Sequence, residues 1–224
     1  MSTNTSFLET SDVIPDVLPQ STKLSSDLII RWPDTILDSP GLELGREETQ
    51  PEPTIQLKPL SEGRHSNYVL IMTDPDLMSK NDQQFGQVRH WLATNISVDD
   101  SGKLHIPNDG VISPYIGPAP LPNYLAKRPH RYIFILAEPK DKQTVTIESE
   151  DLIKLQTNYS AAFEGAQDQQ DLKDRWGFNA QKLLEEKGLE AVAVTFMFVA
   201  GTIKSAAENI TMTAQAGVNK VLGK

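Results

Sequence analysis

The sequence predicts a mainly β fold of the α+β class, with an antiparallel sheet core and a few peripheral helices. Five short runs are rich in β-branched, aromatic and aliphatic residues, which are the types enriched in strands. These runs are 54–60, 67–73, 89–97, 131–138 and 191–199. A proline-dense stretch separates the third run from the fourth, and clear helical patterns occur only after the fourth run.

The length and composition fit one large domain. The chain has 224 residues, and single all-β domains of this size are common. Its 38% of hydrophobic and 23% of charged residues are typical of a globular protein. We expect a single domain over 1–224, with an N-terminal segment and polar connection at 1–53, a core at 54–199 and a C-terminal helix at 200–224.

Proline and glycine mark the connections between the elements. Residues 36–53 combine both types with several acids, which predicts a polar connection before the first strand. Four closely spaced prolines follow further on: Pro114, Pro118, Pro120 and Pro122. Their density excludes a central strand and favours a stiff, extended loop, which would preorganise the rim of a pocket.

Two segments have helical patterns. Asn179 precedes residues 180–187 and Gly188 follows them, which predicts a short helix with an N-cap and a glycine C-cap. Residues 203–222 carry apolar side chains at helical spacing, which predicts a second helix. Its apolar stripe packs either on the sheet or against a partner subunit or peptide.

Charge and residue types exclude several classes of function. The net charge of −9 disfavours binding to nucleic acid or anionic membranes, because both reward clustered Lys and Arg. The absence of cysteine excludes a disulfide scaffold and thiol catalysis and removes the commonest zinc ligand, so we expect no metal and no cofactor. The sequence also lacks a nucleophile elbow, a P-loop and an HExxH zinc motif.

Targeting signals are not evident in the sequence. No apolar run approaches the roughly 18 residues of a transmembrane span, so we expect no integral membrane association. Residues 1–20 lack the basic start and apolar block of a secretory signal. We therefore expect a cytoplasmic protein in which any anionic ligand is held by a local pocket.

Two carboxylates and two histidines stand out as candidate site residues. Asp74 and Asp76 flank Pro75, which restricts the preceding backbone to an extended form and favours a turn at the end of a strand. His90 and His130 lie in or beside separate predicted strands. A pair of histidines can donate N–H groups to an oxyanion, since a bound phosphate can hold an imidazole with an ordinary pKa of about 6.5 in its cationic form. Asp74 or Asp76 would accept an imidazole N–H and aim the opposite ring nitrogen at the ligand.

Each of these features has a simpler interpretation when it is taken alone. A histidine in a strand is more often a hydrogen-bonded core residue than a ligand contact. Asp-Pro-Asp forms an ordinary turn, and Gly-Pro-x-Pro forms an ordinary loop. Their occurrence together, in one order along the chain, favours a shared site.

Four segments carry a family resemblance: Asp74-Pro75-Asp76, His90-Trp91-Leu92, residues 114–118 (PYIGP) and His130-Arg131-Tyr132. In this order and at this spacing, they resemble the phosphatidylethanolamine-binding protein (PEBP) family, whose small anion pocket is built from such segments. The resemblance covers roughly residues 53–199, and residues 14–18 look like the N-terminal entry segment of many members. The cytosolic fungal and yeast carboxypeptidase-inhibitor branch looks nearest.

The resemblance implies a large antiparallel sheet, a second smaller sheet, peripheral helices and a pocket for phosphate-like anions. It implies that the following residues line or support the pocket: Asp74, Asp76, His90, Tyr115, Gly117, Pro118, His130 and Tyr132. The implied partners are a small anionic ligand, such as phosphate, a phospholipid headgroup or a polycarboxylate, and a peptidase.

The predicted rim departs from the usual family pattern. Met78 stands where members usually carry a second proline, and residues 123–129, which include Lys127 and Arg128, replace a glycine-rich link. The rim is therefore expected to be larger, less flexible and more basic, which suits a ligand different from, or larger than, a simple phospholipid headgroup.

Two functions follow from the resemblance. The first is binding of an anion by a protein that inhibits a peptidase or modulates a signalling partner, and inhibition would use a mobile N-terminal segment at 1–20. The second is catalysis, because some fungal relatives assist the cyclisation or dimerisation of polycarboxylate or maleic-anhydride intermediates in secondary metabolism. In that case His90 or His130 would act as a general base and Arg128 or Arg131 would stabilise an enolate. A structural ion pair is the alternative role of Arg131.

Overall fold

The structure is a computed structural model that describes residues 3–59, 66–77, 79–82, 85–120, 128–155 and 174–201. Its main feature is a seven-stranded sheet with the order β3-β10-β9-β5-β6-β7, in which β8 also pairs with β6. The strands are β3 (Leu42–Glu43), β10 (Leu189–Val199), β9 (His130–Pro139), β5 (Tyr68–Asp74), β6 (Val88–Val98), β7 (Leu104–His105) and β8 (Val111–Ser113). Every pair is antiparallel except the short parallel pair of β10 with β3.

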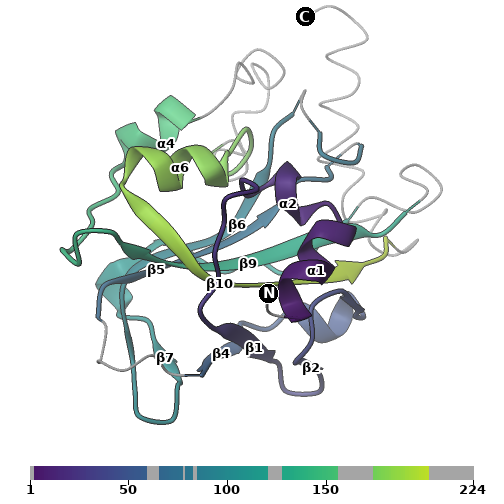
Figure 1. Ribbon diagram of the computed structural model, residues 1–224. Helices are drawn as coiled ribbons and strands as arrows, with labels where there is room; N and C mark the ends of the chain where they lie inside the picture. The colour runs from purple at the N-terminus through teal and green to yellow at the C-terminus, as the bar shows by residue number, and fades with distance from the viewer. Residues whose placement is uncertain are drawn as a thin grey trace, which may run out of the picture.

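A second, smaller sheet lies below the large one in Figure 1. Its order is β2-β1-β4, and both strand pairs are antiparallel. The strands are β2 (Ile36–Leu37), β1 (Asp27–Arg31) and β4 (Thr54–Lys58). The two sheets together confirm the predicted fold class.

Short helices accompany the sheets. The α-helices are α1 (Thr3–Thr10), α2 (Val13–Asp16), α4 (Ser149–Leu155) and α6 (Ala180–Glu186), and the 3-10 helices are η1 (Glu47–Thr49) and η2 (Asn108–Gly110). Figure 1 shows α4 and α6 above the large sheet, on the side away from β1, β2 and β4. In the described part of the chain, no helix is long and apolar enough to cross a membrane.

A hydrophobic core lies on each face of the large sheet, because its central strands alternate their side chains. In β9, Ile133 and Ile135 join the cluster formed with the α-helices. Phe134 and Leu136 join the cluster that also contains Leu28, Ile30 and Ile55 of the smaller sheet. Residues 130–137 are buried throughout, as expected for a strand covered on both faces.

The five predicted strands are confirmed, with ends that differ by at most two residues where the structure describes them. They correspond to β4, β5, β6, β9 and β10. The N-cap at Asn179 is also confirmed, because its side chain accepts a hydrogen bond from the Lys182 backbone N–H at 2.9 Å. Gly188 follows the helix with a φ of +60°, the conformation that glycine adopts most easily. The helix predicted at 203–222 lies outside the described residues.

The strands begin earlier in the chain than predicted. The first strand is β1 at Asp27, and the expected polar connection at 36–53 contains β2, β3 and η1. β2 and β3 have two residues each, so their sequences are too short to show an alternating pattern. β1 is longer but reads DLIIR, a run with charged ends that the strand criteria did not select.

The expectation of a mobile N-terminal segment is also wrong for the residues that the structure describes. Leu8, Val13, Val17 and Leu18 have no exposed surface, and they pack with the helix-side core. Burial of four such side chains is worth about 1.5–3 kcal/mol each before the cost of ordering the chain. Residues before 54 therefore form part of the core instead of only preceding it.

Candidate functional site

The candidate site lies where three neighbouring strands of the large sheet end together. Asp74 is the last residue of β5, His130 is the first residue of β9, and His90 lies near the start of β6. The register of β5 with β6 passes from Met72↔Trp91 to Thr73↔Arg89, so His90 is the extra residue of a β-bulge. A bulge redirects a side chain, and it places the His90 ring against Tyr132 of β9.

His130 and Asp74 form a buried pair at the centre of the site. His130 Nδ1 lies 2.9 Å from Asp74 Oδ2, and the two side chains are only 1% and 4% exposed. A carboxylate oxygen accepts hydrogen bonds, so Nδ1 carries the proton and Nε2 is left with a lone pair when the ring is neutral. Among the described residues, no hydrogen-bond partner reaches the buried His130 Nε2. The two predicted acceptors are therefore distinguished, because Asp74 and not Asp76 accepts from the imidazole.

His90 faces the same site as a neutral ring. Its Nδ1 donates to the carbonyl oxygen of Ile116 at 2.9 Å, which leaves Nε2 as an acceptor. Its ring meets the Tyr132 ring edge-on, with centroids 5.1 Å apart. Burial lowers the pKa of His90 below its ordinary value, and the nearby Asp74 carboxylate opposes this shift only in part.

Because of His90, the free energy of unfolding should decrease when the pH is lowered from about 7 to about 5.5. The folded-state pKa lies below the unfolded value of about 6.5, so the unfolded chain takes up the proton first and the stabilisation present above that pH is lost. For one proton the slope is at most about 1.4 kcal/mol per pH unit. Urea unfolding in phosphate-free buffers should show a shallower pH dependence for His90→Gln than for the wild type. Equal slopes in the two proteins would show that His90 is not held neutral.

The Tyr132 ring contacts the rings of both histidines. Its ring stacks on that of His130, with centroids 6.4 Å apart and planes 16° from parallel. The hydroxyl accepts a hydrogen bond from the Ala119 backbone N–H at 3.2 Å and also interacts with Asp74. Burial and the Asp74 charge raise the pKa of Tyr132 well above its ordinary value, so the phenol remains protonated.

The other predicted loop residues fix the backbone around the site. The Tyr115 hydroxyl donates to the Thr49 carbonyl oxygen at 2.6 Å and accepts from Trp32 Nε1 at 3.3 Å. The Pro118 carbonyl oxygen accepts from Gln50 Nε2 at 2.9 Å. A Cβ on Gly117 would lie 2.8 Å from Gln50 Cα, so a larger residue would displace the loop. These contacts give Tyr115, Gly117 and Pro118 a supporting role.

Arg131 occupies the opposite side of the same strand end. Its Nη2 donates to Asp76 Oδ1 at 2.7 Å and its Nε to Asp76 Oδ2 at 2.8 Å. Its Nη1 donates to Asp16 Oδ2 at 2.9 Å. Burial opposes ionisation of Asp76, but Arg131 and backbone N–H groups outweigh it and lower the Asp76 pKa. This geometry favours the structural ion pair over an enolate-binding role for Arg131.

Arg128 is the more accessible of the two candidate cations. Its side chain is 29% exposed, and its Nη2 lies 3.5 Å from Asp76 Oδ1. The adjoining rim residues 121–127, including Lys127, and the departure at Met78 lie outside the described residues. Arg128 is therefore a partly exposed cation beside Asp76, unlike the buried Arg131.

Sequence reasoning missed Asp16 and Asn81 as members of the network behind the site. Asn81 Nδ2 donates to Asp16 Oδ1 at 2.9 Å, and the Asn81 backbone N–H donates to Asp76 Oδ1 at 2.9 Å. Asp16 lies in the entry segment that the sequence analysis singled out at 14–18, so position alone was a signal. No local pattern distinguishes Asn81 from an ordinary turn asparagine.

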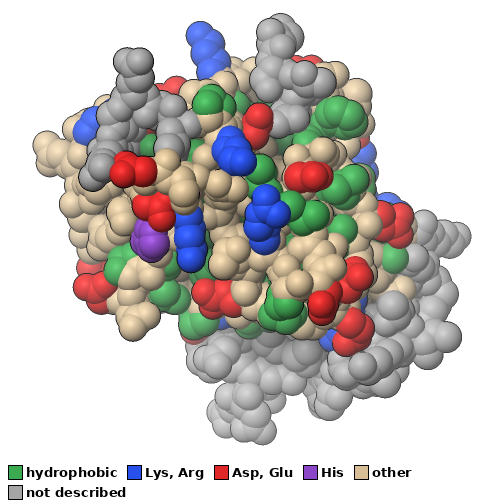
Figure 2. Space-filling model, turned by 90° about the horizontal axis from the view of Figure 1, so that it is seen from below, with side chains coloured by type: hydrophobic (Ala, Val, Ile, Leu, Met, Phe, Trp, Pro, Cys, Tyr) green, Lys and Arg blue, Asp and Glu red, His purple; other side chains and the backbone are tan. Residues whose placement is uncertain are grey.

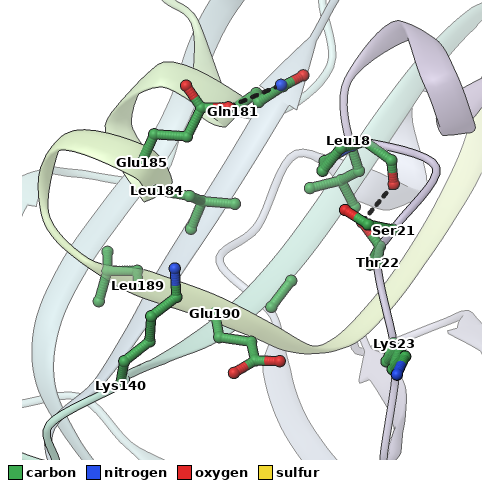
Figure 3. A pocket seen from close by; sticks show the side chains of 12 residues that line it. Leu18, Ser21, Thr22, Lys23, Lys140, Gln181, Leu184, Glu185, Leu189 and Glu190 are labelled. Atoms are coloured by element: carbon green, nitrogen blue, oxygen red, sulfur yellow. Dashed lines mark hydrogen bonds between the residues drawn. The ribbon is translucent and has the colours of Figure 1, made fainter.

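Two cavities lie on the helix side, and neither is lined by Asp74, His90, His130 or Tyr132. One of about 330 Å³ lies between residues 18–23, α6 and the start of β10, with Leu18, Leu184 and Leu189 beside charged residues such as Lys140 and Glu190 (Figure 3). The other, of about 350 Å³, is lined by Asp16, Pro75 and Asn81 together with residues near α6. No predicted ligand-binding residue lines the first cavity, and the second lies directly behind the Asp74-Pro75-Asp76 turn.

The fold and the site define a two-sheet β protein with a buried histidine–carboxylate pair at the end of its large sheet. The family model for the phosphatidylethanolamine-binding protein family matches residues 21–197, and the chain belongs to this family. The predicted resemblance is confirmed.

Two relatives in sequence come from a yeast and a plant. An uncharacterized protein of Saccharomyces cerevisiae is 31% identical over 150 residues, which cover 62% of this chain and 72% of the relative. The CEN-like protein 1 of Nicotiana tabacum is 30% identical over 115 residues, which cover 50% of this chain and 51% of the relative.

Solved structures show the same fold. Carboxypeptidase Y inhibitor, in complex with its cognate proteinase, gives a TM-score of 0.66 at 19% identity, over 88% of this chain and 94% of that one. A phosphatidylethanolamine-binding protein from Plasmodium vivax gives 0.58 at 19% identity, over 88% and 97%. At these identities the likeness concerns the fold alone.

Proposed function

We propose that this protein binds phosphate-like anions at the site formed by Asp74, His90, His130 and Tyr132, and that it acts in the cytosol as a peptidase inhibitor or signalling modulator. The observation that carries the anion site is the buried His130 Nε2, which has no partner among the described residues. A buried polar atom without a hydrogen bond costs about 1–3 kcal/mol, and an incoming ligand atom would remove that cost.

The chemistry of the pair suits a hydroxylated oxyanion such as a phosphate monoester. A neutral His130 can accept a hydrogen bond from a P–OH group at Nε2. A protonated His130 can donate from Nε2 to a phosphoryl oxygen, because Asp74 at 2.9 Å from Nδ1 supplies the opposite charge. Arg128 at the rim adds a cation, and the same donors could hold a carboxylate of a polycarboxylate ligand.

The charge distribution of the protein favours anion binding at a local site over binding to a broad charged face. Figure 2 shows acidic and basic side chains interspersed over the face that bears the smaller sheet. The net charge is −9, so the overall field repels polyanions such as nucleic acid. Anion binding would therefore depend on local donors.

The inhibitor role is supported by the fold shared with carboxypeptidase Y inhibitor. Residues 3–18 pack on the sheet, so an inhibitor that works through this segment would have to release it, and otherwise another surface would meet the peptidase. A signalling partner and a peptidase are alternatives within the same proposal.

Calorimetric titration with inorganic phosphate, phosphoethanolamine and a small tricarboxylate tests the proposal. We expect saturable one-to-one binding of at least one phosphate compound with no new product in the mass spectrum. Consumption of the tricarboxylate would establish the enzyme alternative, and no binding of any of the three would contradict an anion site.

A further inference from the structure

We infer that Asp16 of the N-terminal segment, residues 3–18, is a positioning residue for the anion site, so that docking of this segment and binding of the anion favour each other. The inference rests on the proposed function. It is carried by an unbroken series of contacts from the segment to His130 Nδ1.

The outer part of the series joins the segment to Arg131. Arg131 Nη1 donates to Asp16 Oδ2 at 2.9 Å and to the Ser11 carbonyl oxygen at 3.0 Å. Asp16 Oδ1 accepts from Asn81 Nδ2 at 2.9 Å. The Arg131 side chain is 2% exposed, so these hydrogen bonds are shielded from water and fix the guanidinium strongly.

The inner part of the series joins Arg131 to the ligand-facing histidine. Arg131 donates to both carboxylate oxygens of Asp76, and the Asp76 backbone N–H donates to Asp74 Oδ1 at 2.7 Å. Asp74 Oδ2 in turn accepts from His130 Nδ1 at 2.9 Å. Each group in the series therefore orients the next one, and the last determines where His130 Nε2 points.

This series is a polar link between the segment and the turn, in addition to the exposed pair of Asp12 with Lys80. The cavity of about 350 Å³ borders Asp16, Pro75 and Asn81, so continuous packing does not fix these three residues against one another. The apolar side chains of the segment pack in the helix-side core, whose members do not include Asp74, Pro75 or Asp76. Hydrogen bonds through Asn81 and Arg131 are the contacts that attach Asp16 itself to the network at the turn.

A coupling of this kind is reciprocal. If docking of the segment strengthens anion binding, the bound anion must strengthen docking by the same factor. A partner that removes the segment from the sheet would then weaken anion binding, and a bound anion would oppose such a partner.

Asp16→Asn tests the positioning role, and Asp12→Asn is the matched control. The first change replaces one of the two acceptor oxygens with an N–H₂ group. That group is a donor and would meet a donor of either Arg131 or Asn81, so one hydrogen bond would be lost. The second makes the same chemical change in the same segment, where Asp12 pairs with Lys80 on the surface. We expect Asp16→Asn to weaken inorganic phosphate binding by about two- to thirtyfold and to shift the His130 ring nitrogen signals in NMR spectra of the ligand-free protein. Asp12→Asn should change neither.

Hydrogen exchange on the wild type measures the reciprocal effect without any substitution. Saturating phosphate should slow amide exchange within residues 5–18. If the wild type binds phosphate but Asp16→Asn binds it equally well, or exchange in 5–18 is unchanged, the coupling is wrong and the anion site stands. If the wild type binds no phosphate compound, the proposed function and this inference both fail.

Discussion

Arg131→Met is expected to destabilise the fold by about 3–5 kcal/mol, the range for removing one partner of a buried ion pair. The Asp76 side chain is fully buried, and Arg131 supplies donors to both of its oxygens. Methionine fills much of the same volume, so the expected loss comes mainly from the uncompensated carboxylates of Asp76 and Asp16. The free energy of unfolding from urea titration at neutral pH measures the effect.

Lys80→Met is the control for this prediction. Lys80 pairs with Asp12 in an exposed position, and such pairs contribute about 0–1 kcal/mol. The two substitutions remove cations from the same part of the molecule and differ in burial. A loss below about 1 kcal/mol for Arg131→Met would mean that the network contributes no more than a surface pair.

His130→Ala is expected to weaken binding of inorganic phosphate by about tenfold to a hundredfold. Hydrogen bonds to charged groups contribute about 1.5–3 kcal/mol, and the substitution removes the donor or acceptor at Nε2. His105→Ala is the matched control. His105 also pairs with a carboxylate, through Nε2 at 2.8 Å from Asp99 Oδ2, but this pair is exposed. Calorimetric titration of the two variants gives the comparison.

Thermal melting establishes whether His130→Ala remains folded at the temperature of the titration. If the folded variant binds phosphate as well as the wild type does, the ligand does not contact His130. Equal losses in His130→Ala and His105→Ala would point to a general electrostatic effect instead of a defined site.

The strands that could be predicted are those with long apolar sequences. β6 and β10 have 11 residues each, and β9 is buried along nearly its whole length, so composition alone identifies them. β3 depends on a neighbour that lies far away in sequence, as in the pairing of Leu42 with Met197, whereas β2 pairs with the adjacent β1, Ile36 with Arg31. A local pattern cannot reveal a strand that exists because another strand is beside it.

The candidate site also has a part that could be predicted from the sequence and a part that could not. The order of the family segments predicted that Asp74, His90 and His130 would come together, and the structure places them at one sheet end. The structure gives Asp74 and Asp76 different roles, because Asp74 pairs with His130 whereas both oxygens of Asp76 accept from Arg131. The contact of Arg131 with Asp16 spans 115 positions in the sequence, and no spacing rule could have indicated it.

The most direct test of the account is ¹⁵N NMR of the histidine ring nitrogens in the wild type during titration with inorganic phosphate. We expect a saturable shift at His130 Nε2, with Nδ1 still protonated toward Asp74 and the exposed His105 ring unchanged. If His130 shows no response while phosphate binds, or if His105 responds equally, the ligand does not occupy the site formed by Asp74, His90, His130 and Tyr132.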